Sequence, residues 1–145
     1  MATMATGRDI IENCACNKVR TAARSITGAY DEALRPTGLR ATQLAVLAAV
    51  EADGSVSITA LAQLLGMDRS TLSRNLGPLE KAGLVRLGTE GWRRSRTLEI
   101  TKKGRSQFEK AVPLWEAAQQ SLRGKLGERD WAAVRDSLDR LVRVK

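Results

Sequence analysis

The sequence predicts a mostly α-helical domain with a small β-hairpin, and three patterns support this fold class. Apolar residues recur at three- and four-residue steps near both ends of the chain, as they do in amphipathic helices. The middle of the chain carries a short helical segment, a glycine and a well-capped second helix. Two stretches that alternate apolar and polar residues then flank a basic loop. A chain of 145 residues is expected to form one domain, residues 1–145.

The first helix is expected over residues 10–34 and ends before Pro36 and Gly38. Its apolar positions have helical spacing and are Ile11, Ala15, Val19, Ala22, Ile26, Ala29 and Ala33. A second helix is expected over residues 41–51, and it ends near the Asp53-Gly54 turn. The residues on its apolar side are Leu44, Leu47 and Ala48.

The middle of the chain predicts a helix-turn-helix. A brief helix covers residues 58–65 and starts near Thr59, and Gly66 permits a sharp turn after it. Asp68 can accept hydrogen bonds from the free N–H groups that begin a new helix. This new helix is expected to stop at Gly83, where a left-handed cap fits glycine. Its buried positions are Leu72, Leu76 and Leu79.

A two-stranded ribbon is expected next, because residues 84–87 and 95–100 alternate apolar and polar side chains. The loop between them, residues 88–94, is basic and forms a wing. Thr101 then caps a helix with one apolar stripe, formed by Phe108, Val112, Trp115, Ala118, Leu122 and Leu126. A last helix follows Gly127, and its stripe consists of Trp131, Val134, Leu138 and Leu141.

The apolar stripes at both ends of the chain need a surface that covers them. We therefore expect residues 9–35 and 101–145 to be dimerisation helices of a homodimer. Residues 40–100 are expected to form a winged helix-turn-helix region between them. The first residues lack a signal sequence and no segment is long and apolar enough to cross a membrane, so a cytoplasmic protein is expected.

Positive charge is concentrated in residues 69–105, which hold ten basic residues and three acidic ones. This quarter of the chain therefore carries +7 of the formal net charge of +8, and a field of one sign attracts polyanions. The chain has no histidine and two cysteines, which argues against an enzyme, a metal site or a cofactor. Its five aromatic residues are scattered and suggest no stacking platform for single-stranded RNA, so double-stranded DNA is the expected partner.

The candidate DNA-binding residues lie on the helix that Asp68 opens and on the wing. The helix exposes small and hydroxylic side chains around a long arginine, as close approach to a major groove requires. Arg74 is the leading base reader, and a phosphate contact or a solvated charge is its alternative role. Arg69 is expected to hold phosphate. The other candidates on this helix are Ser70, Thr71 and Ser73.

The wing carries three arginines, Arg93, Arg94 and Arg96, which are expected to enter a minor groove. Their alternative role is to protect the edge of the ribbon from pairing with other strands. Trp92 is expected to pack under the wing.

The run Ile58-Thr-Ala-Leu-Ala-Gln-Leu-Leu-Gly-Met-Asp-Arg-Ser-Thr-Leu-Ser-Arg-Asn-Leu, followed by Leu79-Glu-Lys-Ala-Gly-Leu-Val-Arg, resembles MarR-family regulators. The similarity continues through Arg93-Arg94-Ser95-Arg96 and Leu98-Glu-Ile-Thr-Lys-Lys-Gly104 and covers nearly the whole chain. It implies a triangular winged-helix homodimer whose first and last helices form the interface. It also implies two recognition helices in successive major grooves of a pseudo-palindromic operator. The chain departs from the family at Trp92, where an aspartate usually precedes the wing arginines.

The first helix is also similar to the branch of this family that senses organic hydroperoxides, through the spacing of Cys16, Arg24 and Tyr30. Arg20 departs from that branch, which has a tyrosine there. Basic neighbours can lower the pKa of a thiol, which makes Cys16 a candidate redox switch, and a structural thiol is its alternative role. Cys14 is not expected to bridge Cys16, because residues two apart on a helix point to different sides.

A sequence-specific, dimeric transcription regulator, most simply a repressor, is the function that the sequence favours. The resemblance implies release by a small ligand, such as an aromatic carboxylate, or by thiol oxidation. It places the ligand in a cleft between the terminal helices and the winged domain, and Tyr30, Arg24 and the second helix are the candidate lining. A non-specific architectural DNA-binding protein is the alternative function. An enzyme or a purely protein-binding winged helix leaves the arginines unexplained.

Overall fold

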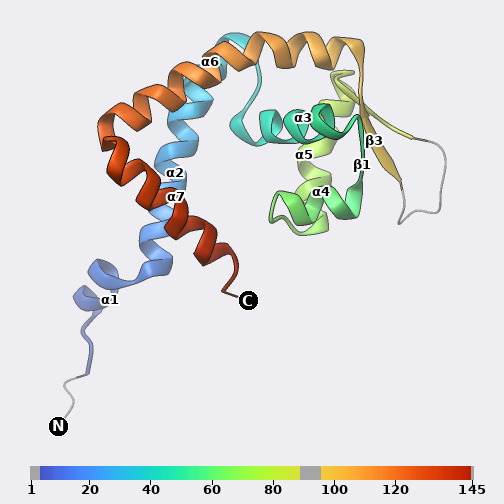
Figure 1. Ribbon diagram of the computed structural model, residues 1–145. Coiled ribbons are helices and arrows are strands. Elements are labelled where there is room, and N and C mark those ends of the chain that lie inside the picture. Colours follow the sequence, from blue (N-terminus) through green and yellow to red (C-terminus); the bar gives the residue numbers. More distant parts are fainter. Residues whose placement is uncertain (1–3, 89–95, 145) are drawn as a thin grey trace.

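The computed structural model describes residues 4–88 and 96–144 (Figure 1). The helices are α1 (Gly7–Asn13), α2 (Ala15–Leu34), the 3-10 helix η1 (Arg35–Thr37), α3 (Ala41–Asp53), α4 (Ile58–Leu64), α5 (Arg69–Lys81), α6 (Lys102–Leu126) and α7 (Glu128–Val142). The strands are β1 (Ser55–Ser57), β2 (Val85–Leu87) and β3 (Thr97–Ile100). This architecture confirms the predicted fold class. Within the described residues, no helix has both the length and the apolar character that a membrane crossing requires.

Helix α6 joins two parts of the molecule (Figure 1). Helices α1, α2 and α7 lie on one side, and α3, α4, α5 and the sheet lie on the other. The short helix, turn and capped helix that the sequence predicts correspond to α4, Gly66 and α5. The first of these begins at Ile58, the start of the expected range, where the Ser57 hydroxyl accepts a hydrogen bond from the Ala60 N–H.

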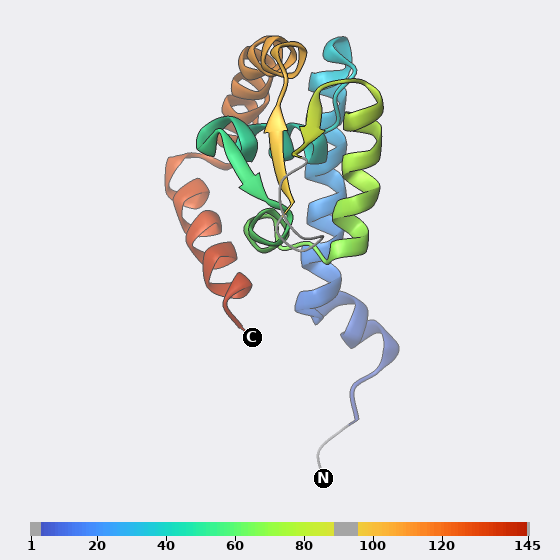
Figure 2. The ribbon, with the colours of Figure 1, turned by 90° about the vertical axis from the view of Figure 1, so that its right-hand side faces the viewer.

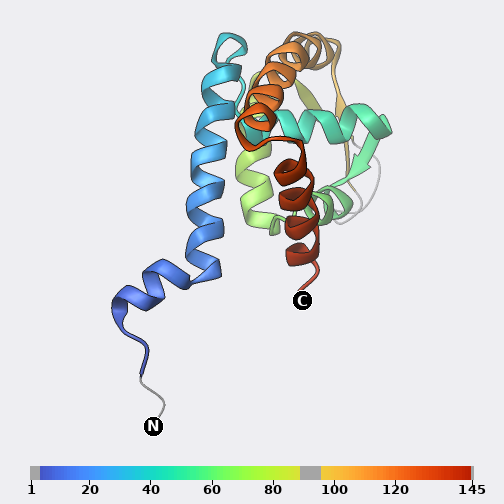
Figure 3. The same cartoon turned by 60° about the vertical axis from the view of Figure 1, so that its left-hand side comes forward.

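The prediction of one continuous helix over residues 10–34 was wrong. The chain is extended at Cys14, which separates α1 from α2, and α1 turns away from the axis of α2 (Figure 3). A capping box between Thr6 and Asp9 stabilises α1 as a separate short helix. The Asn17 side chain donates a hydrogen bond to the Ile11 carbonyl, at 3.3 Å, and so satisfies a carbonyl near the break.

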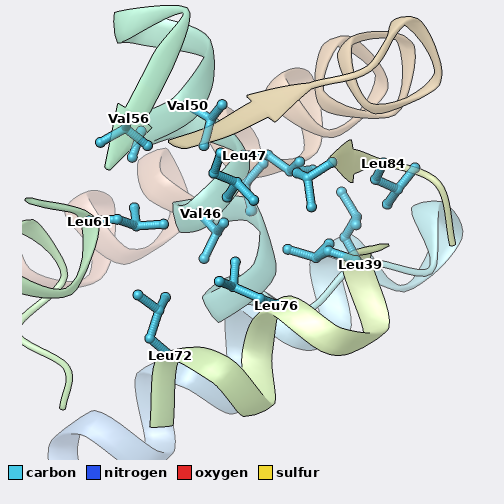
Figure 4. Packing of buried hydrophobic residues seen from close by; sticks show 14 of the residues in the cluster. Leu39, Val46, Leu47, Val50, Val56, Leu61, Leu72, Leu76 and Leu84 are labelled. Atoms are coloured by element: carbon cyan, nitrogen blue, oxygen red, sulfur yellow. The ribbon is translucent and has the colours of Figure 1, made fainter. Parts of the chain in front are cut away.

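Helix α3 lies at the centre of the core. Its buried residues are Leu44, Val46, Leu47, Ala49 and Val50. Figure 4 shows Val46 and Leu47 beside Leu72 and Leu76 of α5, and all four side chains are at most 5% exposed. Helix α5 is therefore held against α3 by its apolar side, which leaves its other side toward solvent.

In the described residues the three strands form one antiparallel sheet in the order β1-β3-β2 (Figure 2). Strands β2 and β3 form the predicted ribbon, but the expectation of only two strands was wrong. Strand β1 pairs with β3, with Val56 opposite Leu98. Beyond β1, the Ile58 N–H donates to the Arg96 carbonyl at 3.1 Å, so the beginning of α4 is bonded to the base of the wing.

The beginning of α6 packs closely against the segment that joins α5 to β2. The Thr101 hydroxyl accepts from the Gly104 N–H at 3.0 Å, which confirms the predicted cap, and it also donates to the Gly83 carbonyl at 2.6 Å. A Cβ atom at Gly104 would lie 2.8 Å from the Leu84 carbonyl carbon and still closer to its oxygen. Only glycine fits at this position without a shift of the backbone.

We expect Gly104→Ala to destabilise the fold by about 2 kcal/mol or more, because overpacking against backbone atoms forces the chain to move. Urea unfolding followed by circular dichroism measures the change. Gly124→Ala is the matched control in the same helix, since no atom lies within 4 Å of its Cβ position. It should leave the stability unchanged or raise it by up to about 1 kcal/mol. Equal stability of the two variants would contradict the packing described here.

Candidate nucleic-acid interface and adjoining cavity

Asp68 organises the beginning of α5. Its Oδ1 accepts from the Thr71 N–H and from the Ser70 hydroxyl, each at 2.7 Å, and its Oδ2 accepts from the Thr71 hydroxyl at 2.9 Å. These hydrogen bonds, with the Thr71 N–H contributing most, lower the pKa of the Asp68 carboxyl from 3.8 to about 2. The side chain is therefore an ionised acceptor at neutral pH.

Helix α5 has two distinct sides. Its buried side consists of Leu72, Leu76 and Leu79. The residues on its exposed side are Arg69, Ser70, Ser73, Arg74, Gly77 and Lys81, and Thr71 is half-buried at the margin. The Arg74 Nη2 lies 3.5 Å from the Thr71 Oγ1, and within the described ranges no carboxylate forms an ion pair with Arg74. A long cation surrounded by small side chains is thus presented to solvent.

The wing is described only at its base. Arg96 is exposed directly before β3. Arg93, Arg94 and Trp92 lie outside the described residues. Across the base of the wing, Arg86 of β2 forms a 2.8 Å ion pair with Glu99 of β3.

Two further basic residues of the charged segment have partners within the fold. Lys103 Nζ donates to the Ala82 carbonyl at the end of α5, at 2.8 Å. Arg105 forms a 2.9 Å ion pair with Glu51 of α3. These side chains hold α6 against α3 and α5, so the interface contains fewer free charges than the count of +7 indicates.

A cavity of about 490 Å³ lies between α2, α3 and α6. Its lining residues are Tyr30, Ala41, Leu44, Ala45, Ala48, Phe108, Val112 and Trp115. Three aromatic rings and small alanines shape its walls, and all eight residues are uncharged. The volume is in the range of sites that hold small organic molecules.

Two polar groups at the cavity have partners within the fold. The Tyr30 hydroxyl donates to the Gln119 Oε1 of α6, and burial raises the pKa of the Tyr30 phenol. The N–H of Ala41, at the beginning of α3, donates to the Asp31 Oδ1 at 2.7 Å. The Asp31 side chain thus occupies the helix end that would otherwise attract an anion.

Comparisons with known proteins agree with this geometry. A model of the MarR family matches residues 37–95. The M. tuberculosis transcriptional regulator MosR is 38% identical over 90% of this chain and 94% of that chain, with a TM-score of 0.80. The same regulator in complex with DNA is 40% identical over 90% and 95% of the two chains, with a TM-score of 0.82.

The chain belongs to the MarR family. A mutant of E. coli MarR complexed with operator DNA shares its fold, with a TM-score of 0.80 at 20% identity over 91% and 96% of the two chains. No curated protein matches the sequence.

In this MarR-family chain, the three candidate effector or redox residues are not brought together. Tyr30 lines the cavity, whereas Arg24 is exposed on α2 and donates to the Thr21 hydroxyl at 3.3 Å. Cys16 is exposed in the first turn of α2, 14 positions before Tyr30, which is about 21 Å along a helix. Cys14 is half-buried at the helix break. The premise that both cysteines lie on one helix was therefore wrong.

The sequence interpretation of this MarR-family member missed two residues of the site, Asp31 and Gln119. Each forms its contact across two helices, from α2 to α3 and from α2 to α6. Neither residue lies on an apolar stripe or in a motif. Only the packing of the helices reveals their roles.

Proposed function

We propose that this chain acts as a homodimeric transcription regulator that binds a specific double-stranded DNA operator and releases it when a small molecule binds. The observation that carries this proposal is the geometry of α5. Its buried leucines fix the helix on α3, and Arg74 projects from a face of small residues. We propose that the chain has no enzymatic activity and that it acts in the cytoplasm.

In this proposal α5 lies in a major groove of the operator. Ser70, Thr71 and Ser73 approach the base edges, and Arg74 donates two hydrogen bonds to a guanine. Arg69, at the beginning of the helix, holds a phosphate. Arg96 continues the basic surface toward the minor groove, together with Arg93 and Arg94 of the wing.

We expect Arg74→Ala to weaken binding to the preferred operator by about 1–3 kcal/mol and to abolish discrimination at one base pair of each half-site. Arg69→Ala is the matched control, since it should weaken binding to all duplexes alike. It should also reduce the slope of log affinity against log salt concentration by about one, the effect of one phosphate contact. Selection from a random duplex library, followed by fluorescence anisotropy, measures both. If the wild-type protein binds random and selected duplexes equally, it is a non-specific DNA-binding protein and the proposal is wrong.

The terminal helices support a homodimer. Helix α7 has an apolar stripe, yet none of its residues is buried in the single chain. Val134, Leu138 and Leu141 are 38%, 43% and 49% exposed. Ile10, Ile11 and Val19 of α1 and α2 are also exposed. A second copy would cover these surfaces and hold two α5 helices at a fixed separation.

We expect Leu138→Lys to convert the dimer into monomers and to reduce operator affinity by at least tenfold, because a buried lysine carries a large desolvation cost. Ala132→Lys is the matched control, since residue 132 is exposed and lies about 120° around α7 from Leu138 at 100° per residue. Analytical ultracentrifugation measures the oligomeric state. A Leu138→Lys protein that remains dimeric and binds DNA normally would show that α7 is not the interface.

The cavity supports a small-molecule effector of a particular chemical class. Its aromatic walls favour a flat apolar ligand, and its lining contains no cation that could pair with a carboxylate. The nearby Asp31 carboxylate further disfavours an anion. We therefore propose an uncharged aromatic molecule in place of the aromatic carboxylate that the family resemblance implied.

We expect Ala45→Phe to fill the cavity and to abolish the release of DNA by uncharged aromatic compounds, while operator binding is retained. Ala52→Phe is the matched control on α3, since Ala52 is exposed and lies outside the cavity lining. The ligand class is measured by comparing how well uncharged phenols and benzoates release the protein from its operator. Release by benzoates alone would contradict the proposed class. Release by peroxide that Cys16→Ser abolishes would instead favour thiol oxidation as the signal.

A further inference from the structure

The hydroxyl groups at the beginning of α5 have a fixed direction of hydrogen bonding. A hydroxyl has one hydrogen to donate and two lone pairs that accept. The Thr71 hydroxyl lies 2.9 Å from the Asp68 Oδ2, and the Ser70 hydroxyl lies 2.7 Å from the Asp68 Oδ1. An ionised carboxylate can only accept, so each hydroxyl must donate its single hydrogen to Asp68.

On its outward side, the Thr71 hydroxyl oxygen also faces a hydrogen-bond donor. Arg74 directs its Nη2 donor at the Thr71 Oγ1 from one turn along the helix, at 3.5 Å. This contact is long, and it is consistent with a hydroxyl oxygen whose lone pairs are available for another donor. Asp68 itself is exposed and caps the beginning of the helix.

We infer that Asp68 sets the polarity with which Ser70 and Thr71 read DNA, so that both hydroxyls act as acceptors and select amino groups over keto groups. In a major groove, adenine and cytosine present amino hydrogens, whereas guanine and thymine present keto oxygens. Thr71 and Ser70 therefore select adenine or cytosine on the strand that they contact. Asp68 is a positioning residue that determines specificity without touching a base. This inference rests on the proposed DNA-binding function.

Asp68→Asn tests the inference because it keeps the helix cap and changes one hydrogen bond. Asparagine caps helices as well as aspartate does, and its Oδ1 can still accept from the Thr71 N–H and the Ser70 hydroxyl. Its amide nitrogen replaces the Oδ2 and donates to the Thr71 hydroxyl. The hydrogen of Thr71 is then free to point outward, while that of Ser70 stays in place.

The experiment compares the base preferences of the wild-type protein, Asp68→Asn, Thr71→Val and the double variant on a library of duplexes. Thr71→Val identifies the position that Thr71 reads. We expect the wild-type protein to prefer adenine or cytosine there by roughly 2- to 10-fold, the effect of one hydrogen bond. Asp68→Asn should erase or reverse this preference at that position alone. In the Thr71→Val background, Asp68→Asn should change no preference.

The ratio of affinities is the measurement that decides, because the loss of a negative charge raises the affinity for every duplex alike. An unchanged preference in Asp68→Asn would overturn the inference, and so would a wild-type preference for guanine or thymine at the Thr71 position. A Thr71→Val protein with unaltered preferences would also overturn it. A wild-type protein that has no sequence preference at all would refute the proposed function itself, which distinguishes the two failures.

Discussion

The burial of α3 is the constraint on which the rest of the structure depends. Its apolar residues face α5 and the sheet on one side, through Val46 and Leu47, and the cavity between α2 and α6 on the other, through Ala45 and Ala48. One helix is therefore the support of α5 and a wall of the cavity. A molecule that wedges α3 away from α2 and α6 has to move α5 with it, because packed cores move as units.

Charge in this chain has two uses that the sequence alone does not separate. Arg86, Lys103 and Arg105 are bonded within the fold and fix the sheet, α5 and α6 relative to one another. Arg69 and Arg74 are presented to solvent on α5. The same segment thus contains residues that hold the fold together and residues that face solvent. The solvent-facing cations determine how strongly salt weakens the binding of a polyanion.

The helix-turn-helix could be predicted because its signals are local: Gly66 at the turn, Asp68 at the cap and leucines at helical spacing. The break at Cys14 was missed because the apolar periodicity continues through it, without proline or glycine. Strand β1 was missed because it has three residues, of which only Val56 is buried. The cavity depends on contacts between helices that lie far apart in the sequence, such as Tyr30 with Gln119, and no local pattern encodes such a pair.

The pairing of β1 with β3 has a consequence for variation in chain length. Strand β1 leaves α3 after a tight turn at Gly54 and leads at once into α4, while its partner β3 carries the root of the wing. An inserted or deleted residue at this turn would slide β1 by one step against β3 and turn Val56 outward. The position of Arg96, at the base of the wing, would then change relative to α4. The fold should therefore tolerate inserted or deleted residues after α7 far more readily than between α3 and α4.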